Sequence, residues 1–179
     1  MSAISTWCLA AALFHAPPET RPQFPGHEET VAETRKRYVS ICADIEAAAT
    51  ERPERPGFLS HRDRAALLLA LAIGESGLAR DADLGPCYRE GKWRTRCDGG
   101  RAATIWQLHA TRDDDSEQTE LGTRDLFADR RRAARVALRL AQGSIGMCRK
   151  LPAEDRLSAY GSGRCLTGEY KGSSSVRAR

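Results

Sequence analysis

The sequence lacks a long hydrophobic run, and it lacks a large excess of positive or negative charge. No apolar stretch in its 179 residues reaches the roughly 18 residues of a membrane-spanning helix, so we expect no membrane span. Lysine and arginine number 28 against 24 aspartates and glutamates, and a net charge of +4 fits an acidic polymer without selecting one. With 41% hydrophobic residues, the chain is too apolar for a disordered protein and suits one globular domain.

The six cysteines lack the C-x-x-C spacing of a zinc site, so we expect no metal centre there. An even number favours disulfides and an oxidising compartment, and the alternative is six buried thiols in a cytosolic protein. Cys87 and Cys97 flank a short polar stretch, while Cys148 and Cys165 flank a helix and a glycine-rich end. We therefore predict the disulfides Cys87–Cys97 and Cys148–Cys165.

Residues 1–28 are predicted to form an N-terminal arm or a weak signal-like segment. Residues 7–16 are apolar, but no lysine or arginine precedes Arg21, so a signal peptide here lacks its positive start. A short apolar helix packed on the domain explains the same residues. Cys8 lies in this stretch, and its pairing with Cys42 stays open.

The chain also lacks internal repeats and strand-rich regions, so we predict a mainly α fold over residues 29–168 and a flexible tail over 169–179. An apolar stripe predicts a helix over residues 29–50. Ser60, with an acid three residues on, predicts the N-cap of a second helix that is apolar on every face and ends near Glu75.

The remaining elements are expected from shorter signals. Glycines and proline predict loops over residues 79–103, with a short hairpin between the two cysteines there. Further helices are predicted over 103–110, 124–142 and 152–160. The arginines between 130 and 139 are expected to form a solvated helix face.

Glu75 is an unusual charged residue, because it lies at the end of the most hydrophobic predicted helix. Burial disfavours the charged form of a carboxyl group and raises its pKa, and the negative end of a helix acts in the same direction. A carboxylic acid that stays protonated near neutral pH is what a general acid needs. The alternative is a glutamate at a helix end that points into water.

Glu75 belongs to the first of four sequence fragments that follow one another along the chain. They are ALAIGESGL at 70–78, ATIWQL at 103–108, LFADRRRAARVALRL at 126–140 and LSAYGSG at 157–163. Across residues 60–165 they resemble the soluble lytic transglycosylase family of the lysozyme-like superfamily. That family has Glu-Ser at a helix end, a G-L-M-Q-I segment, a helix opening with leucine and phenylalanine, and A-Y-N-x-G. The sequence departs from the pattern at Thr104, where the family usually has glycine, and at Gly161, where it usually has asparagine.

The resemblance implies a lysozyme-like single domain with a small disulfide-pinned loop or hairpin, and a lytic transglycosylase that cleaves peptidoglycan. Glu75 would protonate the oxygen between N-acetylmuramic acid and N-acetylglucosamine. It would then accept the proton of the muramic 6-hydroxyl, which leaves a 1,6-anhydro end without a second carboxylate. Ser76, Trp106, Gln107 and Tyr160 match the family motifs and are the candidate substrate-binding residues.

Two alternatives share this fold. One is a hydrolytic lysozyme or phage-type endolysin, in which Asp81 or Asp83 activates a water molecule; both are otherwise exposed loop acids. The other is an inert wall-binding or virion structural module. A basic nucleic-acid binder would leave Glu75 unexplained. The resemblance implies no cofactor, a monomer that binds glycan strands but not nucleic acid, and a periplasmic or secreted location, with phage lysis or a virion as further settings.

Overall fold

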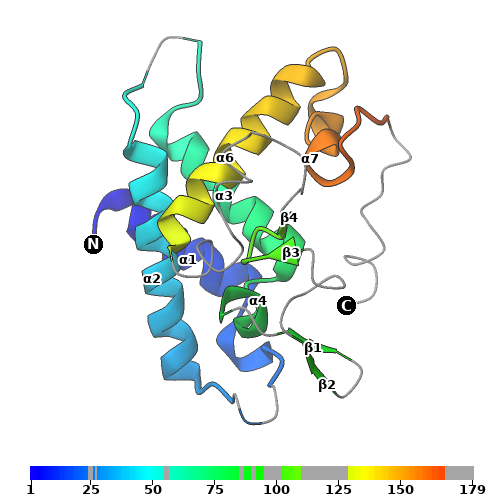
Figure 1. Cartoon of the computed structure of the whole chain (residues 1–179). Coiled ribbons are helices and arrows are strands. Elements are labelled where there is room, and N and C mark those ends of the chain that lie inside the picture. The colour runs from blue at the N-terminus through cyan, green and yellow to red at the C-terminus, as the bar shows by residue number, and fades with distance from the viewer. Residues whose placement is uncertain are drawn as a thin grey trace.

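The structure is a computed structural model that describes residues 1–23, 26, 28–54, 57–84, 87–89, 92–94, 102–109 and 129–167. For residues 87–89, 92–94 and 109 it describes the backbone only. The predicted mainly helical class is confirmed (Figure 1). The longer helices are α1 (Ala3–His15), α2 (Val31–Thr50), α3 (His61–Ser76) and α6 (Arg130–Met147).

Helix α2 lies at the centre of the core and packs against α1, α3 and α6. Its buried stripe includes Tyr38, Ile41 and Ile45, none of which is exposed to solvent. Helix α3 contributes a second set of buried residues, and α6 adds small ones, which lets the helices approach closely. These sets are Leu68, Leu69 and Ala72 from α3 and Ala134, Ala137 and Ala141 from α6.

The starts of α2 and α3 follow from local capping. Thr30 and Glu33 form a capping box, in which each side chain accepts a hydrogen bond from the other residue's backbone N–H. The predicted N-cap at Ser60 is confirmed, because its hydroxyl oxygen accepts from the N–H of Asp63. Helix α3 ends at Ser76, one residue beyond the expected position, and so keeps Glu75 within its last turn.

The N-terminal residues form helix α1, which packs against α2 and α3 and buries Cys8 and Ala12 in the core. In the structure, residues 7–15 belong to this packed helix. A disulfide joins Cys8 to Cys42 of α2, a pairing that the spacing left open. A 3₁₀ turn, η1 (Pro18–Thr20), follows α1.

The predicted disulfide Cys148–Cys165 is confirmed. It joins the end of α6 to the segment after α7 (Ser158–Ser162). The predicted pair Cys87–Cys97 falls outside the residues whose side chains are described. The short hairpin expected there is present in the backbone, because β1 (Cys87–Arg89) pairs antiparallel with β2 (Lys92–Arg94).

The prediction of a helix over residues 103–110 is wrong. The segment forms a second antiparallel hairpin, β3 (Ala102–Ala103) and β4 (Leu108–His109), joined by a tight turn. Thr104 and Gln107 have φ angles of +65° and +48°, which a right-handed helix excludes. The apolar side chains that suggested a helix are instead buried from a turn, among them Ile105 and Trp106.

Three other boundaries differ from expectation. The start predicted for α6 at residue 124 lies outside the described residues; the described helix begins after the N-cap Asp129 and continues five residues beyond 142, to Met147. The helix expected over 152–160 is divided into a 3₁₀ turn, η3 (Ala153–Asp155), and α7. A short helix, α4 (Arg80–Leu84), stands within the predicted loop. Among the described helices, none is long and apolar enough to cross a membrane.

Candidate active site

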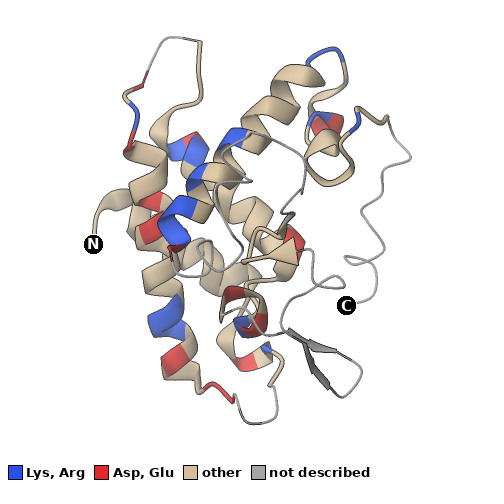
Figure 2. Ribbon diagram, viewed as in Figure 1, with Lys and Arg blue, Asp and Glu red and all other residues tan. Residues whose placement is uncertain are grey.

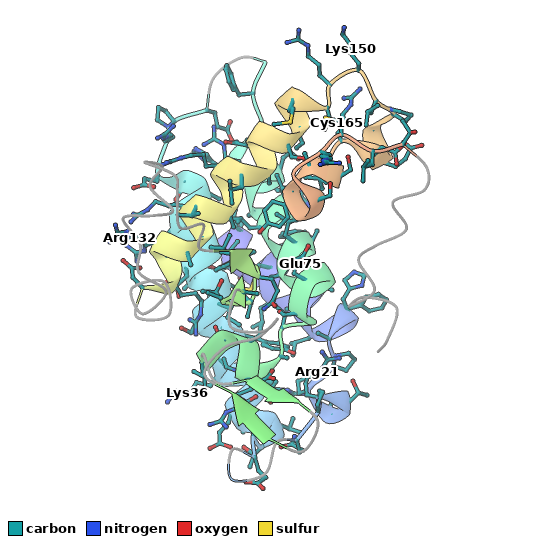
Figure 3. All side chains as sticks on the ribbon, turned by 45° about the vertical axis from the view of Figure 1, so that its right-hand side comes forward. Arg21, Lys36, Glu75, Arg132, Lys150 and Cys165 are labelled. Carbon is teal, nitrogen blue, oxygen red and sulfur yellow. A yellow bond between two sulfur atoms is a disulfide. The ribbon has the colours of Figure 1, made fainter. Side chains whose placement is uncertain are left out.

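Glu75 lies in the last turn of α3, on the side of the molecule that carries the β3–β4 hairpin (Figure 3). Its side chain is partly buried, and this burial raises the pKa of the carboxyl group. Within the described part of the chain, no hydrogen bond or ion pair engages the carboxylate. Glu75 is therefore a partly desolvated acid that retains access to solvent and has no partner there to hold its charge.

Tyr160 of α7 lies close enough to Glu75 for an electrostatic interaction between the two side chains. Burial and the negative charge of Glu75 together raise the pKa of the Tyr160 hydroxyl, so that hydroxyl stays protonated. It donates a hydrogen bond of 2.9 Å to the carbonyl oxygen of Trp106. Tyr160 therefore contributes a neutral oxygen beside the acid, and its proton is directed at the hairpin rather than at Glu75.

Trp106 is fully buried and connects the hairpin to α3. Its indole Nε1 donates to the carbonyl oxygen of Leu68 at 2.9 Å, inside the same helix that carries Glu75. With the bond from Tyr160, this fixes the turn between α3 and α7. Trp106 is therefore a buried residue that holds the hairpin against α3, whereas the sequence predicts that it contacts substrate.

Gln107 is partly buried, and its side-chain amide donates to the carbonyl oxygen of Thr104 at 2.9 Å. The Thr104 hydroxyl accepts from the N–H of Trp106 at 3.3 Å. Thr104 is the position at which the resembled family usually has glycine, and its φ of +65° is one that glycine adopts without cost. The left-handed backbone at this position is therefore adopted here by a β-branched residue.

Ser76 does not orient Glu75 through its proton. Its hydroxyl donates to the carbonyl oxygen of Ala72 at 2.9 Å, one helical turn back. A serine near a helix end commonly satisfies a backbone carbonyl in this way. Of the predicted site residues, Tyr160 therefore lies near Glu75 and is hydrogen-bonded to Trp106, Gln107 follows Trp106 in the same turn, and Ser76 bonds a carbonyl oxygen of its own helix.

The expectation that Asp81 and Asp83 are exposed loop acids is wrong, because both are buried in α4. Asp83 accepts two bonds from Arg130, from Nε at 2.8 Å and Nη2 at 2.9 Å, and lies 3.7 Å from Nη1 of Arg37. Both carboxylate oxygens of Asp83 are therefore engaged by guanidinium groups, and its side chain is 1% exposed to solvent. Asp81 accepts from the N–H of Ala82 at 2.9 Å.

Arg130 is correspondingly no part of a solvated face. Besides Asp83, it donates to Asp44 of α2 at 2.9 Å, and these ion pairs connect α2, α4 and α6. Figure 2 shows the basic N-terminal end of α6 beside acidic positions of the neighbouring helices. This part of the arginine run therefore stabilises the fold around the segment that follows Glu75.

Two arginines that the sequence did not single out contact the turn after Glu75. Arg21 donates through Nη1 to the carbonyl oxygen of Gly77, and Arg37 donates through Nη1 to that of Leu78 at 3.0 Å. They lie 56 and 41 residues away in the chain, so no local motif relates them to the acid.

A shallow groove of about 520 Å³ lies between the end of α6 and Cys165, well apart from Glu75 (Figure 3). In the described part of the chain, no group of three or more histidine, cysteine or acidic side chains is placed to hold a metal ion. No family model, curated protein or solved structure matches this chain.

Proposed function

We propose that this protein cleaves the glycan strands of peptidoglycan as a lytic transglycosylase with a lysozyme-like fold, and that Glu75 is its only acid–base residue. The observation that carries the proposal is the partly buried Glu75 carboxyl group, whose pKa burial raises and which has no hydrogen-bond partner among the described residues. A carboxylic acid in this state can deliver a proton to a glycosidic oxygen.

The surroundings of Asp83 favour one-acid chemistry over the two-acid alternative. An inverting hydrolase needs a second carboxylate about 6.5–9.5 Å from the acid, free to activate water. Asp83 follows Glu75 closely in the chain, but its side chain is 1% exposed and both oxygens accept from Arg130. The described residues therefore support a reaction in which the substrate supplies its own nucleophile.

In the proposed reaction, Glu75 donates its proton to the oxygen that joins N-acetylmuramic acid to N-acetylglucosamine. The bond from the muramic C1 to that oxygen breaks, and positive charge develops on the sugar ring. The 6-hydroxyl of the same muramic acid attacks C1, and the Glu75 carboxylate accepts the hydroxyl proton. The acid is thus regenerated, no water is consumed, and the products are a 1,6-anhydro end and a free 4-hydroxyl.

Residues around Glu75 have supporting roles in this proposal. The neutral Tyr160 oxygen, held by its bond to Trp106, limits water near the acid without adding a charge. The Gln107 amide donates to Thr104, which leaves its carbonyl oxygen to accept from a sugar acetamido N–H. The two described disulfides suit an oxidising compartment, so we place the protein outside the cytoplasm, acting as a monomer.

Mass spectrometry of purified peptidoglycan after digestion tests the proposal. We expect muropeptides with 1,6-anhydro ends, each lighter than the corresponding reducing-end product by one water. Reducing ends would instead assign the protein to the hydrolases, and an undigested wall, with bound protein recovered in the pellet, would support the inert wall-binding module.

A further inference from the structure

The backbone after Glu75 turns sharply through two consecutive left-handed residues. Gly77 and Leu78 have φ angles of +60° and +56°. The N–H of Gly77 donates to Ile73 at 2.8 Å, and that of Leu78 to Ala72 at 3.5 Å. Glycine adopts this conformation freely, whereas a residue with a side chain, such as Leu78, is strained in it.

Such a strained residue persists only where its surroundings hold it. The Leu78 side chain is fully buried in the core, which fixes one side of the turn. The carbonyl oxygens of Gly77 and Leu78 are held from other segments, by Arg21 and Arg37. Because Glu75 lies two residues before this turn, these contacts fix the helix end from which the carboxyl group projects.

Arg37 is itself firmly placed. Its Nε and Nη2 donate to the two carboxylate oxygens of Glu29 at 2.8 and 2.9 Å, and both side chains are less than a tenth exposed. Nη1 is thereby aimed at Leu78, within 3.7 Å of Asp83. Arg21 has a described hydrogen bond to Gly77, and its removal takes that bond from the turn.

We propose that Arg21 and Arg37 are positioning residues for the acid: they hold the Gly77–Leu78 turn and thereby fix the placement of the Glu75 carboxyl group. The proposal rests on the assignment of Glu75 as the acid. Neither arginine needs to touch substrate. A small misplacement of a catalytic group, caused by a change away from the chemistry, costs up to about 100-fold in rate.

The molecule contains a matched control at the other end of the same helix. Arg64 is 6% exposed and donates to the carbonyl oxygen of Ala49 in the last turn of α2 and to those of Arg52 and Pro53, just after α2 ends. It therefore binds backbone carbonyls beyond a helix end as Arg21 does. It lies eleven residues before Glu75 in α3, roughly 16 Å along the helix axis.

The experiment compares the full chain with Arg21→Met, Arg21→Lys, Arg37→Lys and Arg64→Lys on soluble, uncrosslinked glycan strands. For Arg21→Met we expect kcat to fall about 10- to 100-fold while KM changes by less than about threefold. Arg21→Lys should recover part of this loss, because an ammonium group can still donate to Gly77. Arg37→Lys should also lower kcat, whereas Arg64→Lys should lower thermal stability and leave kcat per folded molecule unchanged.

Two readouts that need no activity separate this proposal from the proposed function. Arg21→Met should accelerate amide hydrogen exchange at Gly77 and Leu78 and shift the carboxyl resonance of Glu75, and Arg64→Lys should do neither. If wild type cleaves nothing, the proposed function fails while these readouts still report whether the turn is held. If Arg21→Met and Arg37→Lys match wild type in kcat, exchange and the Glu75 resonance, the positioning role is overturned.

Discussion

The two central helices, α2 and α3, both end where arginine guanidinium groups bind carbonyl oxygens, but the two ends differ in their acids. At the end of α2, the C-cap Glu51 lies at the surface and pairs with Arg135 at 3.2 Å. At the end of α3, Glu75 is partly buried and has no partner among the described residues. The ends of α2 and α3 thus share arginines that bind carbonyl oxygens. The end of α3 differs in its acid, which has no partner among the described residues.

Exchanging each glutamate for glutamine gives the largest expected contrast. Glu75→Gln keeps the side-chain volume but has no proton to donate to a glycosidic oxygen, so wall cleavage should fall by about 10²–10⁴-fold. Glu51→Gln removes a surface ion pair, which is worth about 1 kcal/mol or less, and should cleave at the wild-type rate. Clearing of cell-wall suspensions measures the rates, and circular dichroism checks that both variants fold.

The buried ion pairs around α4 can be compared through their effect on the free energy of unfolding. Asp83→Asn should lower the free energy of unfolding by about 3–5 kcal/mol, because Arg130 and Arg37 lose a buried counter-charge. Asp44→Asn should cost less, since its side chain is 23% exposed. Urea unfolding of both variants measures this. Equal and small losses would mean that the Asp83 pair does not stabilise the fold around the site.

The disulfides offer a third contrast, because one ties α1 to α2 and the other ties α6 to the segment after α7. Sequence separations of 34 and 17 predict losses of about 4 and about 3 kcal/mol on the chain-entropy model. We therefore expect Cys8→Ser/Cys42→Ser to melt below Cys148→Ser/Cys165→Ser in thermal scans. The reverse order would show that strain or residual unfolded structure, rather than loop length, decides the effect.

Tyr160→Phe should have a smaller effect. It removes the hydroxyl that donates to Trp106 and leaves that carbonyl without its bond, at a cost of about 1 kcal/mol. Activity should persist at a reduced level, because in the proposed mechanism this hydroxyl transfers no proton. Abolished cleavage in a folded Tyr160→Phe variant would instead assign the hydroxyl a direct role in the reaction.

The smallest expected effect is on pH dependence. Since burial raises the pKa of Glu75, the folded protein binds its proton more tightly than the unfolded chain does. Stability should therefore fall as pH rises from about 4.3, the unfolded value, through the raised folded value, and activity should fall as the acid ionises. Glu75→Gln should lose this pH-dependent part of the stability. An identical stability profile for both proteins would contradict the shift.

The sequence predicts well what depends on local pattern. The apolar stripe of α2, the Ser60 cap of α3 and the position of Glu75 on a buried helix end all follow from neighbouring residues. The hairpin at 102–109 does not, because ATIWQL is apolar throughout, and only the left-handed Thr104 and Gln107 distinguish a turn from a helix.

Contacts between distant segments were the other part that the sequence could not predict. Arg21, Arg37 and Arg130 lie among other charged residues and look like solvated side chains, yet each binds a partner more than 40 residues away. The pairing of Cys8 with Cys42 likewise depends on how α1 packs against α2. The position of Glu75 at a buried helix end could thus be predicted from the sequence, whereas the contacts that hold the turn after it could not.

Digestion of peptidoglycan in water enriched in the heavy oxygen isotope tests the central claim most directly, that Glu75 alone serves as acid and base. Mass spectrometry of the wild-type products should find 1,6-anhydro ends that carry no label, and the Glu75→Gln digest should contain no new ends. Label at the newly formed ends would show that water is the nucleophile. New ends in the Glu75→Gln digest at the wild-type rate would show that another group is the acid.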